Sequence, residues 1–326
     1  MWKWGAMSAA VVLAVGVQAA PAAETKPLEP LVISYVPANA THWGLDVARD
    51  EGFFRDAGFD VQVIPFQSSP QSIQLLVSGG AAIATVEPES LVSAVVHGAT
   101  DLAAIAQEEY RPDWMLIGGR DIKSWADLKG KRLGFSTLST GEFWLTEQLL
   151  AKHGLGKGTW SALQVGTSPA KFAALTNGSI AGAVLFQPLA LKGVQQGLHV
   201  LAKFAEVGDF PPTLIPVRRS WAAKDKNGIR LGEALARSNR WLYDPKNRAA
   251  AMQILEKYTK CDAAIAGQLY QELFVTDKLY VRDAAVELKG LERVVGLMAQ
   301  FGEIPGGKAP PPQSFVLGKE MGGLWH

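Results

Sequence analysis

The sequence predicts an α/β protein built from two similar lobes, each a parallel-rich sheet flanked by helices. Three observations support this fold class. Short apolar strands alternate with helical segments along most of the chain, the same strand–helix order occurs twice, and the two copies lie 99 to 100 residues apart. Alternating β-α-β units require parallel strands joined by right-handed crossovers. We therefore expect two sheets of the same topology.

The clearest part of the repeat is a helix followed by a buried strand. Ser69-Pro70 begins a helical segment that ends at Gly79, before the apolar strand 81–86. Ser168-Pro169 begins the counterpart, which runs into strand 182–186. In both segments we expect Ser to be the N-cap, Pro to occupy the first helical position and Gly to provide the left-handed end.

The other elements follow from the same periodicities. Strands are predicted at 31–36, 61–66, 114–118, 132–135, 163–165 and 214–217. Helices are predicted at 42–51, 142–153, 244–258, 262–274 and 283–301, and the proline-containing tail from Gly306 is predicted to be extended on the surface. The strands 114–118 and 214–217 are the expected connections between the lobes.

The first residues are typical of an export signal. Lys3 is followed by an apolar run at 6–17 that is too short to span a membrane, and then by small residues. We predict a signal peptide at residues 1–23, cleaved near residues 19–23. The only cysteine is Cys261, so no intramolecular disulfide is expected, and the signal has no cysteine to carry a lipid. The predicted location is the periplasm, without a lipid anchor.

Composition and motifs favour binding over catalysis. The formal net charge of +1 gives no reason to expect nucleic acid or an anionic membrane as a partner. The sequence has no Cys–His cluster, no histidine-rich metal spacing, no Gly-x-Ser-x-Gly turn and no phosphate-binding glycine loop. We therefore expect no cofactor, no metal and no enzymatic activity.

Four segments carry a resemblance to a known family. They are residues 48–61 (ARDEGFFRDAGFDV), 76–84 (LVSGGAAIA), 127–134 (DLKGKRLG) and 178–184 (GSIAGAV). In this order the sequence resembles the nitrate/sulfonate/taurine group of ABC-transporter substrate-binding proteins, also called the NMT1/THI5-like domain. It departs from the family pattern at Ala81 and Ala181, where Asp is usual, and at Gln67-Ser68-Ser69, where a glycine-rich ligand loop is common.

The resemblance implies a two-lobed periplasmic-binding-protein fold (Venus flytrap, type II) with two hinge strands, which closes on a ligand in the cleft between the lobes. Lobe I is expected to comprise residues 28–113 and 214–326, and lobe II residues 114–213. The implied partners are a small organic anion and an ABC transporter permease with its cytoplasmic ATPase. No nucleic acid is expected, and the chain is expected to be a monomer.

Candidate ligand-binding residues lie in loops at the carboxyl ends of the predicted strands, where ligands of open parallel sheets bind. Most carry hydroxyl or amide groups beside helix N-termini, where backbone N–H groups favour an anion. The predicted site residues are Asn39, Thr41, His42, Trp43, Gln67, Ser68, Glu87, Arg111, Ser136, Thr137, Ser139, Thr140, Trp144 and Gln187. The alternative for the hydroxyl groups is that they cap their own helices, and the alternative for the histidine is a structural role.

Aromatic and charged residues give this site its expected character. Trp43 and Trp144 lie in the first turns of corresponding helices, so their indoles are expected to sandwich a flat or apolar ligand body, with core packing as the alternative. Arg111 is the expected charged partner of an anion, with a solvated loop position as the alternative. Glu108 and Glu109 precede it, and one acid there would suit an amine, as in a taurine-like zwitterion.

Neither the ligand nor the function class is fixed at this point. Alkanesulfonate or taurine-like compounds, aromatic carboxylates, nitrate and pyrimidines all remain open as ligands. One alternative function is an enzyme on the same scaffold that acts on a small aromatic or pyrimidine substrate, with His42 and Glu87 as an acid–base pair. The other is a receptor that presents its ligand to a membrane sensor.

Overall fold

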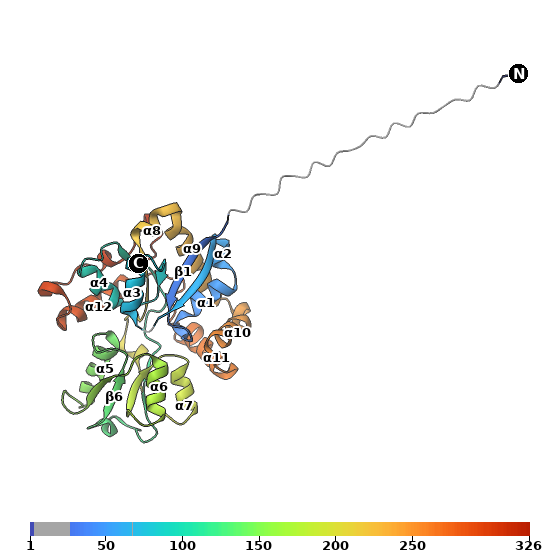
Figure 1. Cartoon of the computed structure of the whole chain (residues 1–326). Helices are drawn as coiled ribbons and strands as arrows, with labels where there is room; N and C mark the ends of the chain where they lie inside the picture. The colour runs from blue at the N-terminus through green and yellow to red at the C-terminus, as the bar shows by residue number, and fades with distance from the viewer. Residues whose placement is uncertain (3–26, 67) are drawn as a thin grey trace.

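Two five-stranded sheets form the frame of the molecule. The computed structural model describes residues 1–2, 27–66 and 68–326, so the predicted export signal from residue 3 onward lies outside the described residues. The first sheet contains β1 (Glu29–Tyr35), β2 (Phe59–Pro65), β3 (Ile83–Ala84), β4 (Leu102–Gln107) and β10 (Leu214–Arg218). The second contains β5 (Met115–Gly118), β6 (Arg132–Phe135), β7 (Ser161–Gln164), β8 (Gly182–Leu185) and β9 (His199–Lys203). We call the parts built on these sheets lobe I and lobe II, seen at the top and bottom of Figure 1.

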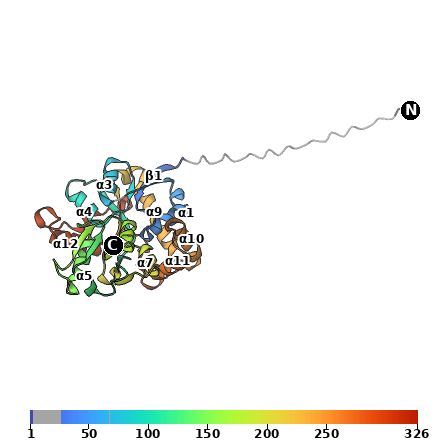
Figure 2. The same ribbon diagram turned by 60° about the horizontal axis from the view of Figure 1, so that its bottom comes forward.

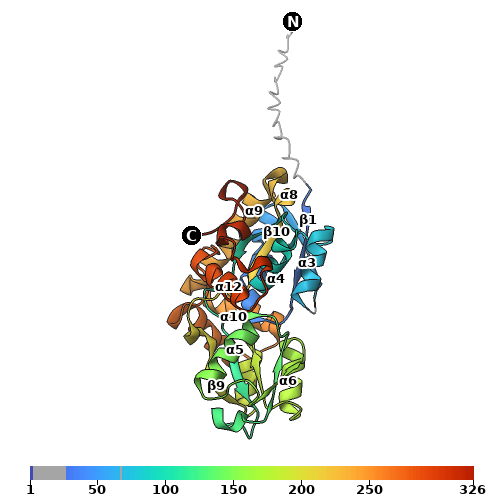
Figure 3. The same ribbon diagram turned by 90° about the vertical axis from the view of Figure 1, so that its left-hand side faces the viewer.

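Helices surround both sheets. Lobe I carries α1 (Trp43–Asp50), α2 (Phe53–Asp56), α3 (Ser69–Ser78), α4 (Pro88–Val96), α8 (Arg219–Ala223), α9 (Asn227–Leu242), α10 (Arg248–Thr259), α11 (Ala263–Tyr270) and α12 (Leu288–Gln300). Lobe II carries α5 (Gly141–Lys152), α6 (Ser168–Thr176) and α7 (Leu189–Gln195). Figure 3 shows α5 and α6 in the lower lobe, with α4 and α12 facing the viewer in the upper one. The predicted residue boundaries of the two lobes stay a prediction.

The two sheets have the same topology. Strand order is β2-β1-β3-β10-β4 in lobe I and β7-β6-β8-β5-β9 in lobe II, and the first three strands of each list are parallel. The fourth position in each sheet holds a strand that has crossed from the other lobe: β10 and β5 run antiparallel to both neighbours. The predicted α/β class is therefore confirmed, and the crossing strand makes each sheet mixed.

The two Ser-Pro pairs begin α3 and α6, but the predicted capping role of their serines is wrong. The N-cap is in each case the residue before the serine. The hydroxyl oxygen of Ser69 instead accepts a hydrogen bond from the backbone N–H of Glu87 at 3.3 Å, and that of Ser168 accepts one from Phe186 at 3.2 Å. These bonds tie the start of each helix to the segment just after the next strand, so the internal repeat extends to individual hydrogen bonds.

The largest differences from the predicted elements lie in the C-terminal third. The predicted helix 283–301 begins only at Leu288, because Val286 pairs in parallel with Trp325 of the tail. The tail returns to the sheet of lobe I, where the N–H of Leu317 donates to the carbonyl of Ala104 in β4 at 2.8 Å. The long helix α9 is absent from the predicted elements.

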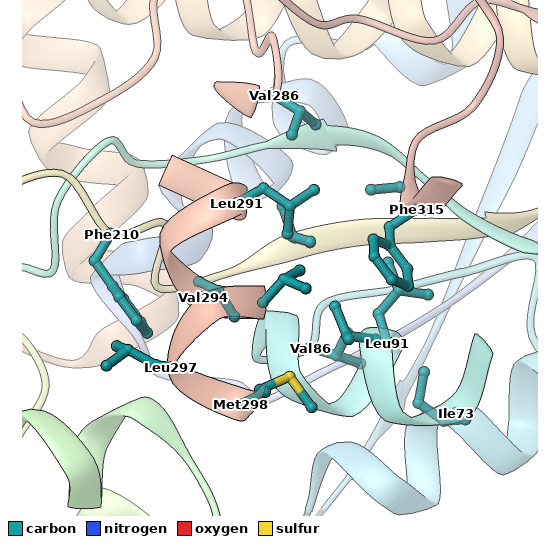
Figure 4. Packing of buried hydrophobic residues seen from close by; sticks show 14 of the residues in the cluster. Ile73, Val86, Leu91, Phe210, Val286, Leu291, Val294, Leu297, Met298 and Phe315 are labelled. Atoms are coloured by element: carbon teal, nitrogen blue, oxygen red, sulfur yellow. The ribbon is translucent and has the colours of Figure 1, made fainter. Parts of the chain in front are cut away.

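A shared hydrophobic core beside α12 joins the two lobes. Figure 4 shows Leu291, Val294 and Met298 of α12 on the side of Leu91 of α4, with Val86, Val286 and Phe315 around them, while Leu297 lies beside Phe210. Trp144 and Val184 of lobe II belong to the same cluster. Because α12 contacts both lobes, it forms one wall of the region between them.

A second core lies where α1, α10 and α11 meet α7. Trp43 of α1 and Leu269 of α11 share a hydrophobic cluster with Leu191 of α7, and α11 lies beside α7 in both Figure 1 and Figure 2. Cys261, just before α11, is half-buried, and burial raises the pKa of its thiol. Within the described part of the chain, no helix has the length and apolar character needed to cross a membrane.

We expect Tyr280→Phe to destabilise the loop that precedes α1. The fully buried Tyr280 hydroxyl accepts a hydrogen bond from the N–H of Trp43 at 3.0 Å and donates to the carbonyl of Ala40 at 2.9 Å. Removing it leaves buried backbone groups without a partner, which costs about 1–3 kcal/mol and lowers Tm by several degrees. Thermal unfolding followed by circular dichroism measures the loss. Tyr110→Phe, where the hydroxyl has no hydrogen bond within the described residues, is the control, and equal Tm values for the two variants would contradict this role.

Candidate functional site

A cavity of about 410 Å³ lies between the two lobes. Its lining comes from the segments that follow β1, β2 and β3 in lobe I and β6, β7 and β8 in lobe II, with a contribution from the C-terminal end of α12. These are the carboxyl ends of parallel strands, where ligand sites of open α/β sheets form. Equivalent loops of the two copies therefore contribute to one cavity.

The cavity has apolar walls as well as polar loops. Phe66, Ile73 and Met298 of lobe I and Phe186 of lobe II supply apolar surface. The Phe186 ring stacks on Trp114, with 5.0 Å between the ring centroids and 18° between the planes. Since Trp114 is buried beside β5, this stacking fixes one aromatic wall at the connection between the lobes.

Most of the predicted site residues are brought together at this cavity. Those that line it are Asn39, Ser68, Glu87, Ser136, Thr137, Ser139, Thr140 and Gln187. Gln67 lies outside the described residues. Some of these side chains already form hydrogen bonds within the protein. The side-chain Oε1 of Gln187, for example, accepts one from the N–H of Leu191 at 3.3 Å. That any of these residues contacts a ligand stays a prediction.

Thr41 and His42 are buried and are not among the residues that line the cavity. The Nδ1 atom of His42 lies 2.8 Å from Oε2 of Glu108, and its Nε2 atom lies 3.3 Å from Oγ1 of Thr85. The ring also meets the ring of Tyr35 edge-on, with 5.4 Å between centroids. This network accounts for His42 as a structural residue of lobe I, which is the alternative given for it, and its hydrogen-bonded carboxylate partner is Glu108.

The predicted indole clamp is also wrong. Trp43 is fully buried, packs edge-on against Phe274 and donates its Nε1–H to the carbonyl of Ala251 at 2.9 Å. Trp144 is 2% exposed and stacks on Phe301, with 5.2 Å between centroids and 14° between planes. The two indoles lie in separate hydrophobic clusters because each helix presents them to a different C-terminal helix. Core packing, the stated alternative, holds for both.

Arg111 does not line the cavity between the lobes. Its Nε atom lies 2.8 Å from Oδ1 of Asp209, and both side chains are about half exposed. The pair borders a separate surface hollow and joins the two segments that connect the lobes. An exposed ion pair of this kind contributes little to stability and leaves the cation engaged.

Glu89 is a buried, charged cavity residue that sequence reasoning missed. It lies in the first turn of α4, is 3% exposed and lines the cavity. Its Oε1 atom accepts a hydrogen bond from the backbone N–H of Gly141 at 2.5 Å, which joins lobe I to the start of α5 in lobe II. Its Oε2 atom has no partner within the described residues. Burial raises the pKa of Glu89 to about 8, and the nearby Glu87 adds to this rise.

Glu87 lies two residues before Glu89, at the N-cap of α4. The Ser69 hydroxyl donates a hydrogen bond to its Oε2 atom. Burial raises the pKa of Glu87; the charge of Glu142 raises it further, and Lys171 opposes the rise. The sequence predicted Glu87 as a site residue, and its neighbour Glu89 had the same signal, since both follow a buried strand at the start of a helix.

A buried ion pair supports the polar loop of lobe II. The Nζ atom of Lys171 is fully buried, 2.6 Å from Oε1 of Glu142 and 3.0 Å from Oγ of Ser136. The same Glu142 oxygen accepts a hydrogen bond from the N–H of Ser136 at 3.3 Å. The charge of Lys171 is therefore engaged within lobe II. Over the described ranges, no group of three or more His, Cys, Asp or Glu side chains could hold a metal ion.

Comparisons with known proteins match this architecture. The family model described as NMT1/THI5 like matches residues 39–246. The protein YtlA of Bacillus subtilis (strain 168), named as a binding protein, is 25% identical over 273 residues, which is 80% of each chain.

Solved structures share the fold. The nitrate-binding protein NrtA from Synechocystis PCC 6803 has a TM-score of 0.76 at 16% identity, covering 90% of this chain and 87% of that one. The alkanesulfonate-binding protein SsuA from Xanthomonas axonopodis pv. citri, bound to MOPS, has a TM-score of 0.70 at 18% identity, covering 89% and 99%. The predicted two-lobed, type II periplasmic-binding-protein fold is thereby confirmed.

We expect Gly141→Ala to separate the lobes. A Cβ atom at residue 141 would collide with the ring of Phe210 and with the Glu89 carboxyl group, so the contact between α4 and α5 cannot form unchanged. The strain costs about 1–3 kcal/mol. Small-angle scattering should show a larger radius of gyration with unchanged helix content. Gly156→Ala, where a Cβ meets nothing within 4 Å, is the control. A radius of gyration equal to that of the control would refute the role of this contact.

We expect Glu89→Gln to flatten the decline of stability with pH. A carboxyl group whose folded-state pKa is raised holds its proton more tightly in the folded protein, so stability falls as pH rises from the unfolded value of 4.5 through about 8. Glutamine keeps the shape and the acceptor for Gly141 without titrating. Urea unfolding at several pH values between 5 and 8 measures the slope. The exposed Glu292→Gln is the control. If the unfolding free energy of Glu89→Gln changes with pH as steeply as that of the control, Glu89 does not retain its proton in the folded protein.

Proposed function

Because the chain belongs to the NMT1/THI5-like family of ABC-transporter substrate-binding proteins, we propose that it binds its solute in the cavity between the lobes and closes on it. The chain is a substrate-binding protein of an ABC import system. The observation that carries the cavity assignment is that equivalent strand-end loops of both lobes line one volume. A ligand held there contacts both lobes at once, which is the requirement for a ligand to favour a closed state.

The proposed hinge consists of the two segments that join the lobes. One runs from β4 to β5 and the other from β9 to β10, so a change of backbone angles in both would move lobe II against lobe I. Two hydrogen bonds between the lobes hold the arrangement seen here, one to a backbone carbonyl and one to a side-chain carboxyl group. The N–H of Ala40 donates to the carbonyl of Gln187 at 2.9 Å, and the N–H of Gly141 donates to Glu89 at 2.5 Å. A bound ligand adds its own contacts to these.

The proposed location is the periplasm, and the proposed partner is a membrane permease with a cytoplasmic ATPase. Structures with this fold include a ligand-binding component of an ABC-type import system from Staphylococcus aureus, at a TM-score of 0.74. In this proposal the closed receptor, acting as a monomer, presents its ligand to the permease. Release follows when the lobes separate.

The size and lining of the cavity support a small organic ligand. A volume of about 410 Å³ lies within the range of small-molecule sites, and aromatic and aliphatic side chains line much of it. A bare inorganic ion would leave these apolar walls without a partner. The organic anion expected from the sequence stays a prediction, and the charge of the lining bears on it directly.

Thermal shifts against a panel of small organic ammonium ions, sulfonates, carboxylates and pyrimidines test this function. A ligand at a hundredfold excess over its Kd stabilises by about 2.7 kcal/mol, which raises Tm by several degrees. We expect one chemical class to give a selective shift that Thr137→Ala reduces, because Thr137 lines the cavity. Thr176→Ala, at the exposed end of α6, is the control and should keep the shift. A shift that Thr137→Ala leaves intact would place the ligand elsewhere.

A further inference from the structure

The charge of the cavity points to an organic cation as its ligand. Resting on the proposed binding function, we propose that a protonated amine or amidine group of the ligand binds Glu87 and Glu89, while its apolar body contacts Phe66, Met298 and Phe186. This head-group charge is opposite to the one expected from the sequence. The assignment of a cationic head group depends on which charged side chains line the cavity and on which nearby charges already have partners.

The ionisable side chains that line the cavity are all acidic. Within the described lining they are Glu87, Glu89 and Glu303. The nearby cation Lys171 is fully buried and bonded to Glu142, as described above. An anion in this cavity would lie beside carboxyl groups, and the described lining offers it no free positive charge. Burying a charge without a partner is costly.

The helix N-termini around the cavity offer an anion fewer backbone N–H groups than the sequence suggests, and the start of α5 is already occupied by the protein. The N–H of Gly141, at the start of α5, donates to the carboxyl group of Glu89. Glu87 and Glu89 themselves lie at the start of α4, where the helix dipole favours their negative charge. In α3 and α6 a proline in the first turn removes one of the free backbone N–H groups.

An unpartnered carboxyl oxygen marks where the ligand donates its hydrogen bond. Glu89 is 3% exposed and lines the cavity, yet its Oε2 atom has no hydrogen-bond partner within the described residues. A buried polar atom without a partner is expensive. A ligand N–H group satisfies this oxygen, and a positive charge relieves the repulsion between Glu89 and Glu87 that raises the pKa of Glu89.

The cavity walls define the rest of the ligand. Phe186 stacks on Trp114 on one side, and Ile73 and Met298 lie on the other lobe, so the ligand body is apolar and short enough to fit about 410 Å³. Aryl- and alkylammonium or amidinium ions have this combination of a charged nitrogen head and an apolar body. Their carbon-matched sulfonates and carboxylates keep the apolar body and replace the cationic donor head group with an anionic acceptor.

Calorimetric titration with matched probes tests the proposal. The probes are benzylammonium, benzamidinium and butylammonium against phenylmethanesulfonate, benzoate and butanesulfonate, with benzyl alcohol as the neutral member. We expect at least one cation to bind ten or more times tighter than its matched anion. Glu89→Gln and Glu87→Gln should each weaken that cation about tenfold or more, whereas the exposed Glu292→Gln should leave it unchanged.

Binding of the cation should also depend on pH. Since the cation favours the ionised form of Glu89, binding releases a proton and affinity rises as pH rises toward about 8. The other ionisable groups that act on Glu87 are Glu142, Lys171 and His42, and Glu303 also lines the cavity; Glu89→Gln leaves all of them in place. We therefore expect the pH dependence between 6 and 8 to flatten in Glu89→Gln.

The outcomes separate this inference from the proposed function. Anions that bind tighter than their matched cations, with affinities that Glu87→Gln and Glu89→Gln leave intact or improve, overturn the cation assignment while the binding function stands. Absence of binding by every probe class, together with absence of any shift across the thermal panel, contradicts both. Cation binding that neither glutamine variant weakens also overturns the assignment, because the head group would then lie elsewhere.

Discussion

One hydrogen bond across the cavity sets the arrangement of the site, from the backbone N–H of Gly141 to the buried carboxyl group of Glu89. Glu89 is fixed by the first turn of α4, and Gly141 is the first residue of α5, so the bond fixes the spacing between two helix starts in different lobes. It forms only because residue 141 has no side chain, which leaves room for the ring of Phe210. The hydrogen bond between Ala40 and Gln187 is a second link between the lobes beside the same cavity.

The two lobes share one topology, and the residues that differ between them determine the charge of the cavity lining. The segment after the third parallel strand carries Glu87 in lobe I and Gln187 in lobe II, each followed by proline. Gln187 is neutral and hydrogen-bonds to both lobes, whereas Glu87 and the buried Glu89 bring two carboxyl groups to one side of the cavity. In lobe II, Lys171 and Glu142 form a buried ion pair, so their two charges compensate each other. The lining is therefore acidic even though the chain as a whole is close to neutral.

The sequence predicted what local patterns determine. The Ser-Pro starts and glycine ends of α3 and α6, and the loops that line the cavity, follow from periodicity and turn chemistry. It did not predict where the indoles of Trp43 and Trp144 point, because their partners lie in helices more than 150 residues further along the chain. In the sequence, Glu89 looks like any acidic residue in the first turn of a helix. Its contact with Gly141 becomes visible only in the folded structure. The amphipathic helix α9 was missed although its buried residues recur at helical spacing.

Distances between the lobes, measured by double electron–electron resonance, show whether the lobes close on a bound solute. Nitroxide labels at Val77→Cys and Val194→Cys, in a Cys261→Ala background, place one probe on exposed α3 of lobe I and one on exposed α7 of lobe II. We expect a broad distribution that includes longer distances without ligand, and a single narrower and shorter distribution with the ligand identified by thermal shift. Distributions that are identical with and without that ligand would contradict closure of the lobes on a solute held between them.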